Sequence, residues 1–557
     1  MIQRKQWAGN SAALVAYGIL SLILFGSTGS WVHRYVAVGV ADPELFMWFL
    51  NWWPFALLHG LNPFWTHFVW YPQGFDTAWA TSVPTLALVA APLTLCAGAT
   101  ASYNALTLLA PALSAWSCFF LVRSITRDDA AGFVAGLIYG FSSYELGQML
   151  GHLNLDFTAL VPLIILLVVK RAHQDISRRV FIPLLAIALV FELGISEEIF
   201  ASLCILGALV WVVFFLTIPI DARGPHGRLA IEIIGAYVLG AAVASPLFYY
   251  LLIGADRVPG AINSPTNFSA DPLNFLVPTQ VTWLGHEFFP GIASRMLGGV
   301  SEQGGYLGII LILILGLYAW EARTNRYARG LIASLLLLVL CSFGPWLHID
   351  GKRTALPLPW IAFAHLPLIK SALPIRFTLY VSLAAAIAVG CWIAMSKGAS
   401  RAIKLALAII AYLCLLPNPP LYKWSDLPVD PLFQMSSRSS LVPSGANIII
   451  LPFGQSGPDM SWQLDAKMRF TQSGGYVGYP PLNEWAEPIV RAFFAGRPEH
   501  NFKHALAAYC HAHQVKDIII GAGTAPPLVS ALRSMRWPMV TKDGDTIITV
   551  LGSPNPG

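Results

Sequence analysis

Residues 108–150 have the sequence LLAPALSAWSCFFLVRSITRDDAAGFVAGLIYGFSSYELGQML, in which a short charged turn separates two long apolar runs. The turn holds Arg123, Arg127 and two aspartates, whereas the runs beside it carry almost no charge. Apolar runs of roughly 20 residues are typical of helices that cross a bilayer. The stretch therefore predicts a membrane-embedded helical hairpin, and GHLNLDF, residues 151–157, leads from it into a further apolar run.

The composition of the whole chain agrees with a membrane location. Of its 557 residues, 56% are hydrophobic and only 11% are charged, whereas about a quarter of the residues in a soluble domain are charged. We therefore expect a polytopic membrane protein, in which the net charge of +5 reflects loops and topology and not nucleic-acid binding. The seven cysteines lack CxxC spacing, so we expect small buried side chains and no disulfide framework.

Eleven segments are candidate membrane-crossing helices. They lie near residues 7–27, 103–122, 131–147, 158–169, 180–195, 199–220, 229–252, 305–320, 330–343, 376–395 and 404–417. The first follows a basic start, as a signal peptide would, but its length and the lack of a clear cleavage site favour a spanning helix. One more apolar run, 81–98, could also cross, and it determines the topology of everything after it.

The basic residues indicate that 81–98 does not cross. Without this crossing, sixteen Lys and Arg residues share the side of the N-terminus in short loops. They are Arg4, Lys5, Arg123, Arg127, Lys170, Arg171, Arg178, Arg179, Arg223, Arg228, Arg323, Arg326, Arg329, Lys397, Arg401 and Lys404. If 81–98 does cross, all of these residues except Arg4 and Lys5 move to the outer side. Because cytoplasmic loops are rich in Lys and Arg, we expect 81–98 to lie at or dip into the outer face.

This topology divides the chain into two parts. Residues 1–417 are predicted to form an α-helical transmembrane domain of about eleven helices, with outer loops 28–102, 253–304 and 344–375. Residues 418–557 contain GANIIILPFG, KDIIIGAG and DTIITVLG among helical stretches, which predicts a small α/β domain. We expect a multi-pass protein of the bacterial cytoplasmic (inner) membrane, with its N-terminus in the cytoplasm and its C-terminal domain extracytoplasmic.

Several acidic residues share the predicted outer end of the helices. They are Asp42 and Glu44 in ADPELFMWFLNWW, Asp156 in GHLNLDF, and Glu197 and Glu198 in GISEEIF. Each alone could be a carboxylate that caps the start of a helix. Together they put several carboxylates at one membrane depth, where ionisable groups are costly unless they face a cavity. The sequence therefore favours a polar site at the outer face.

Polar and basic residues accompany these acids on the same face. His152 and Asn154, in GHLNLDF, are either interfacial hydrogen-bonding residues or part of the site. Arg376, in SALPIRFTLY, is either an interfacial anchor or a bidentate ligand of a phosphate, with Lys370 as the alternate cation. An acid that deprotonates an incoming hydroxyl and a cation that holds a leaving phosphate are what transfer from a lipid phosphate requires.

This layout resembles the GT-C superfamily of integral membrane glycosyltransferases, which use polyprenyl-phosphate-linked sugars. Asp42 with Glu44 matches the acidic motif of their first outer loop, and PTLALVAAPLTL resembles their juxtamembrane helices. The stretch from residue 108 to 160 is similar to the helical hairpin of the mannosyl- and aminoarabinosyl-transferase branch, where a basic turn leads to a span that ends in an Asn-Leu-Asp-like motif. The likeness is best over residues 1–220.

The resemblance implies roles for individual residues. Asp42 would be the catalytic base that activates the acceptor hydroxyl, and Asp156 a second acid that orients the acceptor or helps to bind a metal. Arg376 is our own candidate for the lipid phosphate. Some members of the superfamily use a divalent cation, and Asp42, Asp156, His152, Glu197 and Glu198 have suitable donor atoms, but no spacing here demands a metal.

The loop between residues 255 and 304 is long, polar and rich in aromatic residues. Loops of that length are often functional, and Trp283 and His286 could line a sugar or acceptor site, because aromatic rings pack on the apolar faces of sugars.

The favoured function is an inverting glycosyltransferase that moves a sugar from a polyprenyl phosphate to a glycan, lipid or protein of the cell envelope. One alternative is a transporter or lipid flippase, although helices broken by Gly and Pro in matching halves are not evident. A second is a non-catalytic subunit of envelope assembly. Nucleotide-binding loops and zinc-protease or hydrolase motifs are lacking, so ATP hydrolysis and zinc proteolysis are not supported.

Overall fold

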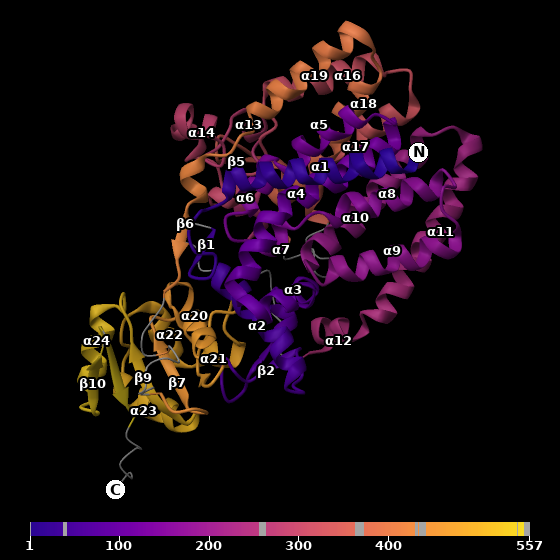
Figure 1. Cartoon of the computed structure of the whole chain (residues 1–557). Coiled ribbons are helices and arrows are strands. Elements are labelled where there is room, and N and C mark those ends of the chain that lie inside the picture. Colours follow the sequence, from indigo (N-terminus) through magenta and orange to yellow (C-terminus); the bar gives the residue numbers. More distant parts are fainter. Residues whose placement is uncertain are drawn as a thin grey trace.

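The computed structural model describes residues 2–36, 42–254, 263–362, 372–428, 433, 442–542 and 544–550. A long bundle of helices makes up most of the molecule, and a sheet with flanking helices packs at one end of it (Figure 1). A helix lies at each of the eleven segments predicted to cross the membrane. These are α1 (Ile2–Phe25), α4 (Ala99–Thr126), α5 (Asp129–Gly140), α8 (Leu160–Ala172), α9 (Arg178–Leu193), α10 (Glu197–Thr217), α11 (Ile220–Val243), α16 (Ile309–Glu321), α17 (Arg326–Ser342), α18 (Thr378–Ala394) and α19 (Gly398–Leu413).

Within the described residues, five stretches are long and apolar enough to cross a membrane by length and composition. They are Ala99–Thr126, Leu153–Ala172, Glu197–Thr217, Ile220–Val243 and Pro374–Ala394. Shorter elements connect the bundle helices. These are α2 (Asp42–Leu58), α3 (Pro84–Ala97), α6 (Ser143–Gln148), α7 (Leu153–Asp156), α12 (Ser245–Ile253), α13 (Pro272–Leu276), α14 (Trp283–Phe288), α15 (Pro290–Ala293) and the 3₁₀ turns η3 (Val300–Glu302) and η6 (Pro374–Phe377).

The predicted hairpin is α4 followed by α5. The backbone turns at Arg127, which is in the left-handed region with φ 56°, and Asp128 caps α5 by accepting a 3.0 Å hydrogen bond from the Ala131 N–H. A Cβ on Gly136 or Gly140 would overlap the backbone of α4. Small residues at these positions therefore let the two helices pack closely, as is usual for helices in membranes.

Helix α3, which covers the uncertain run 81–98, has both ends at the same end of the bundle. The N–H of Thr85, near its start, donates to the carbonyl of Gly194 at the C-terminal end of α9. Near its end, the hydroxyl of Thr94 lies 2.8 Å from that of Ser102, in the first turn of α4. The run 81–98 thus forms a helix whose two ends contact one end of the bundle, and its position at the outer face stays a prediction.

The C-terminal part of the chain contains a five-stranded sheet in the order β10-β11-β9-β7-β8. Its strands are β7 (Asn447–Leu451), β8 (Thr471–Gln472), β9 (Val515–Ile520), β10 (Met539–Lys542) and β11 (Asp545–Thr549), and its helices are α20 (Asp459–Asp465), α21 (Leu482–Ala486), α22 (Pro488–Ala495), α23 (Phe502–Ala512) and α24 (Pro526–Arg533). Strand β7 pairs in parallel with β8 and β9, whereas β11 is antiparallel to β9 and β10. Strands β7, β9 and β11 lie in the three stretches predicted as strands.

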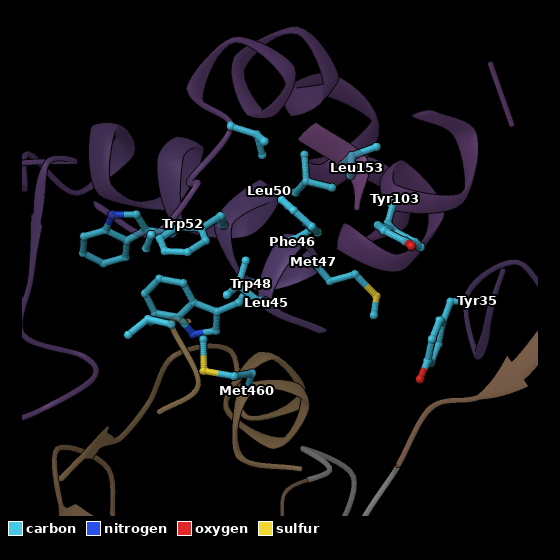
Figure 2. Packing of buried hydrophobic residues seen from close by; sticks show 14 of the residues in the cluster. Tyr35, Leu45, Phe46, Met47, Trp48, Leu50, Trp52, Tyr103, Leu153 and Met460 are labelled. Atoms are coloured by element: carbon cyan, nitrogen blue, oxygen red, sulfur yellow. The ribbon is translucent and has the colours of Figure 1, made fainter. Parts of the chain in front are cut away.

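Helix α2 connects this sheet region to the bundle. Its aromatic side chains other than Phe55 are buried, and the rings of Trp48 and Trp52 stack with their centroids 5.4 Å apart. Figure 2 shows Met460 of α20 beside Trp48 and Leu45 of α2, and the indole of Trp48 donates a 2.7 Å hydrogen bond to Gln463. Two short strands, β1 (Arg34–Val36) and β6 (Trp424–Asp426), pair nearby and add a second link. The start of α2 is therefore enclosed between the bundle and the C-terminal part.

Candidate active site at the start of helix α2

Asp42 lies at the first position of α2 and contacts two segments that are distant in the sequence. Nε2 of His152 lies 3.3 Å from its Oδ2, and the hydroxyl of Tyr476 donates a 2.6 Å hydrogen bond to its Oδ1. Burial alone would raise the pKa of Asp42, but the hydrogen bonds from His152 and Tyr476 and the nearby charges of His152 and Arg376 lower it below the ordinary value. The carboxyl group is therefore an anion at neutral pH.

Glu44 lies two residues along α2 and turns toward the C-terminal part. The hydroxyl of Ser461, in α20, donates a 2.6 Å hydrogen bond to it. Burial raises the pKa of Glu44 to about 7 and that of the neighbouring Asp459 to about 8, and the negative charge of Glu44 adds to the second effect. Glu44 thus lies at the contact between α2 and α20, where burial raises its pKa, whereas the surroundings of Asp42 lower the pKa of that residue.

The motif GHLNLDF places Asp156 one helical turn after His152, the residue that contacts Asp42. His152 is the N-cap residue of α7, and its carbonyl accepts a 3.0 Å hydrogen bond from the N–H of Asp156, the last residue of that helix. The side chain of Asp156 is buried, and neither of its oxygens has a hydrogen-bond partner among the described residues. Asp42 and Asp156 both interact electrostatically with Tyr103. The two predicted catalytic carboxylates thus share one region without touching each other.

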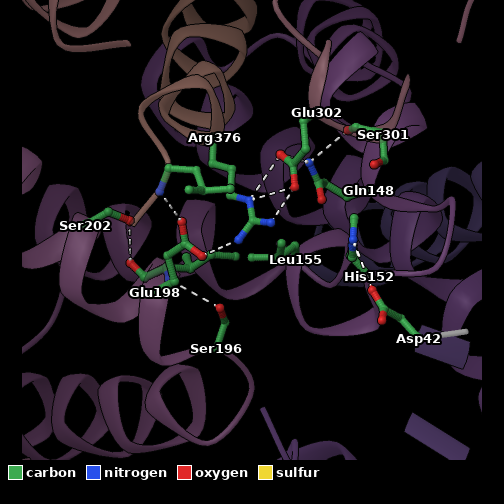
Figure 3. Close-up of polar contacts among 12 residues, drawn as sticks. Asp42, Gln148, His152, Leu155, Ser196, Glu198, Ser202, Ser301, Glu302 and Arg376 are labelled. Carbon is green, nitrogen blue, oxygen red and sulfur yellow. Dashed lines mark hydrogen bonds and ion pairs between the residues drawn. The ribbon is translucent and has the colours of Figure 1, made fainter. Parts of the chain in front are cut away.

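Arg376 is held by two carboxylates, as Figure 3 shows. Its Nε lies 3.1 Å from both oxygens of Glu302, and its other nitrogens also form ion pairs with Glu302 and Glu198. Gln148 donates to the carbonyl of Ser301 and to Glu302. Burial acts to raise the pKa of Glu302, but the attraction and hydrogen bonds of Arg376 outweigh it and lower that pKa. The cation is close enough to Asp42 to lower its pKa as well.

The structure brings together most of the residues that the sequence singled out, but not all. Asn154 is buried in α7, and Glu197 begins α10 beside Glu198. Trp283 and His286 are exposed on α14, and the indole of Trp283 donates to the carbonyl of Leu413 at the end of α19. They are therefore not part of the cluster around Asp42. Lys370 lies outside the described residues.

Sequence reasoning missed Tyr476, Glu302, Gln148 and Ser461. Tyr476 belongs to GPDMSWQLDAKMRFTQSGGYVGYPP, residues 457–481, whose mixture of aromatic, glycine and polar residues is typical of an ordinary loop. Glu302 lies in the predicted outer loop 253–304, where two glycines and a glutamine follow it and nothing marks it as the partner of Arg376. The only available signal was that an isolated membrane-level arginine requires a carboxylate partner.

The donor atoms of the site do not form a ready metal centre. Among the described residues, no three His, Cys, Asp or Glu side chains lie close enough together to hold a metal ion. Both oxygens of Glu302 are engaged by Arg376, and Asp42 accepts from His152 and Tyr476. The ligand set suggested by the sequence for a divalent cation is therefore not assembled in the described part of the chain.

Comparison with solved structures identifies the fold. The arabinofuranosyltransferase AftD from Mycobacteria matches with a TM-score of 0.57 at 15% identity, over 97% of this chain and 40% of its own. The chain thus spans well under half the length of AftD. The oligosaccharyltransferase AglB from Archaeoglobus fulgidus, solved with an inhibitory peptide and a dolichol-phosphate, matches with a TM-score of 0.55 at 12% identity, over 93% of this chain and 70% of its own.

The chain has the GT-C fold. AftD and AglB are glycosyltransferases of this superfamily, so the resemblance seen in the sequence is confirmed at the level of the fold. No family model and no curated protein matches the chain. At identities of 12% to 15% the likeness concerns the fold alone, and the chemistry depends on the residues of this chain's own site.

Proposed function

We propose that the protein is an inverting glycosyltransferase that moves a sugar from a polyprenyl-phosphate donor to a cell-envelope acceptor at the outer face of the membrane. The observation that carries the proposal is the ionised carboxylate of Asp42, which has a hydroxyl hydrogen-bonded to it and a guanidinium nearby. The GT-C fold, shared with AglB in a structure that contains a dolichol-phosphate, supports a lipid-linked donor.

Asp42 would act as the base. The acceptor hydroxyl would donate to Asp42 as the phenol of Tyr476 does, at 2.6 Å and within the reach that general-base catalysis requires. As the acceptor oxygen forms its bond to the anomeric carbon, the bond from that carbon to the phosphate oxygen breaks and the proton passes to Asp42. A single displacement inverts the anomeric configuration, because the nucleophile attacks opposite the leaving phosphate.

Arg376 would stabilise the leaving phosphate. Its guanidinium has a fork of donors that suits phosphate oxygens, and its positive charge reaches the Asp42 region. Glu198 and Glu302 hold these donors by ion pairs. The phosphate would therefore replace one of the two carboxylates on the arginine.

Asp156 would support the acceptor without acting as the base. Its buried carboxyl group has no partner among the residues that the structure describes, one turn from His152. A hydroxyl of a bound sugar could satisfy it.

The proposal is tested by measuring the release of polyprenyl phosphate and the product anomer with a panel of polyprenyl-phosphate sugars and the purified full-length protein. Asp42→Asn should lower turnover by about 10²- to 10⁴-fold, the range for loss of a general base, with normal folding. Asp426→Asn, which changes an exposed carboxylate paired with Arg34, should not. Wild-type turnover by Asp42→Asn would refute the assignment. Uptake into proteoliposomes with no donor consumed would favour a transporter instead.

A further inference from the structure

The described part of the chain has a second polar feature at the opposite end of the bundle from Asp42. It is a cavity of about 910 Å³ between the C-terminal ends of α4 and α8 and the N-terminal ends of α5 and α19. Tyr103, which interacts with Asp42, lies near the start of α4, whereas Arg123 lines the cavity near its end. At 1.5 Å per residue these positions are about 30 Å apart, so the cavity is separate from the candidate active site.

Four cations and two carboxylates line this cavity. Two of the cations are already neutralised, since Arg123 pairs with Asp129 at 2.6 Å and Arg401 pairs with Asp128 at 2.8 Å. The same oxygen of Asp128 also caps α5. Each carboxylate therefore pairs with one cation, and the six charged residues that line the cavity keep a net charge of +2.

The other two cations, Arg127 and Lys170, form no ion pair with any residue that the structure describes. Arg127 follows α4, and Lys170 lies in the last turn of α8, so two separate helices direct positive charge to one cavity. Nε of Arg401 is buried in the same region without a hydrogen-bond partner among the described residues. The cavity thus offers unpaired charge together with an unused donor, which an anion with several oxygens would satisfy.

The rest of the cavity wall is apolar except for Asn10 and Ser124. Phe120 of α4 and Leu166 of α8 line it beside the cations. Phe120 lies about one turn before Arg123, and Leu166 lies one turn before Lys170, so each helix contributes apolar surface toward the middle of the bundle and charge toward its end. This gradient matches a molecule with an anionic head and an apolar body.

From this geometry we infer a binding site for a phosphate-bearing anion at the basic end of the bundle, in which Arg127 and Lys170 hold the phosphate. The phosphate can come from the headgroup of an anionic phospholipid or from a soluble phosphate. Basic pockets between membrane helices are suited to lipid headgroups, and the apolar wall gives an acyl chain a place to lie. The site does not depend on the proposed transferase activity.

The test is thermal stabilisation of the purified full-length protein in a neutral detergent. Short-chain phosphatidylglycerol, short-chain phosphatidylcholine and inorganic pyrophosphate are each titrated. We expect phosphatidylglycerol to raise the melting temperature saturably and phosphatidylcholine to have no such effect. A similar response to pyrophosphate would identify a free phosphate as a sufficient ligand, whereas no response to pyrophosphate would identify a lipid headgroup site.

Substitutions test whether this binding takes place in the cavity. Arg127→Gln with Lys170→Gln should weaken the binding of phosphatidylglycerol by about thirtyfold, as expected for the loss of two cations near a lipid surface. The matched control, Arg326→Gln with Arg329→Gln, removes two exposed cations that do not line the cavity and should leave binding unchanged. Equal weakening in both double variants, or no saturable response of the wild type to either phosphate ligand, would overturn the inference.

Discussion

The hydroxyl of Tyr476 donates a 2.6 Å hydrogen bond to Asp42, across 434 positions of the sequence. Gln455 in turn donates a 2.8 Å hydrogen bond to the Tyr476 oxygen, which fixes the phenol in place. His152 contacts the other oxygen of Asp42, so an acceptor hydroxyl would bind Asp42 in place of the Tyr476 hydroxyl or at a remaining lone pair of the carboxylate. Under the proposed mechanism Tyr476 holds the acceptor position until substrate arrives, and the C-terminal part of the chain thereby takes part in the site.

Tyr476→Phe tests this relationship through the pH dependence of the reaction. The hydrogen bond from Tyr476 lowers the pKa of Asp42, so its removal should raise that pKa. Because the base must be ionised, the acidic limb of the kcat/KM profile should move to higher pH, by about one to two pH units for one hydrogen bond to a charged group. Tyr71→Phe, which removes a hydroxyl bonded to Gln514, is the control. An acidic limb at the same pH as in the wild type would show that Tyr476 does not influence the pKa of the base.

Glu44→Gln should change how stability depends on pH. The folded pKa of Glu44, about 7, lies above its ordinary value of 4.5. Between these two pH values the folded state therefore keeps a proton on Glu44 that the unfolded chain has lost. The stability that this protonated side chain contributes is fully present below about pH 4.5 and is lost as the pH rises through about 7. The variant has no such proton to lose, so its melting temperature should exceed that of the wild type above pH 7.

The measurement is a series of melting temperatures between pH 4.5 and 8 in detergent. Asp459, whose pKa is about 8, gives a further decline at higher pH, and Asp459→Asn should remove that portion. Parallel curves for the wild type and Glu44→Gln would show that Glu44 is not protonated at the contact with α20.

These results show which parts of the protein its sequence predicts. The α4–α5 hairpin follows from apolar runs, a charged turn and well-placed glycines, all of which are local features. The convergence of Asp42 with His152 was also predictable, because the order and sidedness of the helices put both at one end of the bundle. These features can be predicted without knowing which loops contact each other.

The contacts of Tyr476 and Glu302 were not predictable in the same way. Each approaches its partner across a long separation, 434 residues for Tyr476 and 74 for Glu302. Hydrophobic periodicity reports which face of an element is buried, and it carries no information on which loop covers which charge. Trp283 shows the opposite error, because the sequence suggested it for the site whereas its indole contacts the end of a neighbouring helix.

Glu302→Ala should destabilise the fold as well as the site. It leaves Arg376, a largely buried cation, with Glu198 as its remaining carboxylate partner. Breaking a buried ion pair typically costs about 3–5 kcal/mol, and here the cost should be lower because Glu198 remains. Melting temperatures should show a clear loss for Glu302→Ala and a smaller one for Glu302→Gln, which keeps hydrogen bonding. Glu287→Ala, at an exposed position of α14, should have no effect. Equal melting temperatures for Glu302→Ala and Glu287→Ala would contradict this role.

Arg376→Lys tests the contact with the donor phosphate. Lysine keeps the charge but lacks the planar fork of donors, so we expect kcat/KM for the donor to fall by about tenfold or more, equivalent to the loss of one charged hydrogen bond, with KM for the acceptor little changed. Arg295→Lys, in an exposed ion pair with Asp350, is the matched control. An unchanged kcat/KM for the donor would assign Arg376 to structure alone.

Gly147→Ala tests how the fold positions Glu302. Gly147 lies in α6, next to Gln148, and a Cβ there would lie 2.5 Å from the carbonyl oxygen of Ser301. The added methyl must push η3 away from α6, and with it the carboxylate that holds Arg376. We expect activity to fall with less effect on melting temperature. The control is Gly207→Ala in α10, where a Cβ meets nothing within 4 Å and helix propensity favours alanine by about 1 kcal/mol. If Gly147→Ala were as active as Gly207→Ala, the close approach of these two segments would not be what sets the geometry of the site.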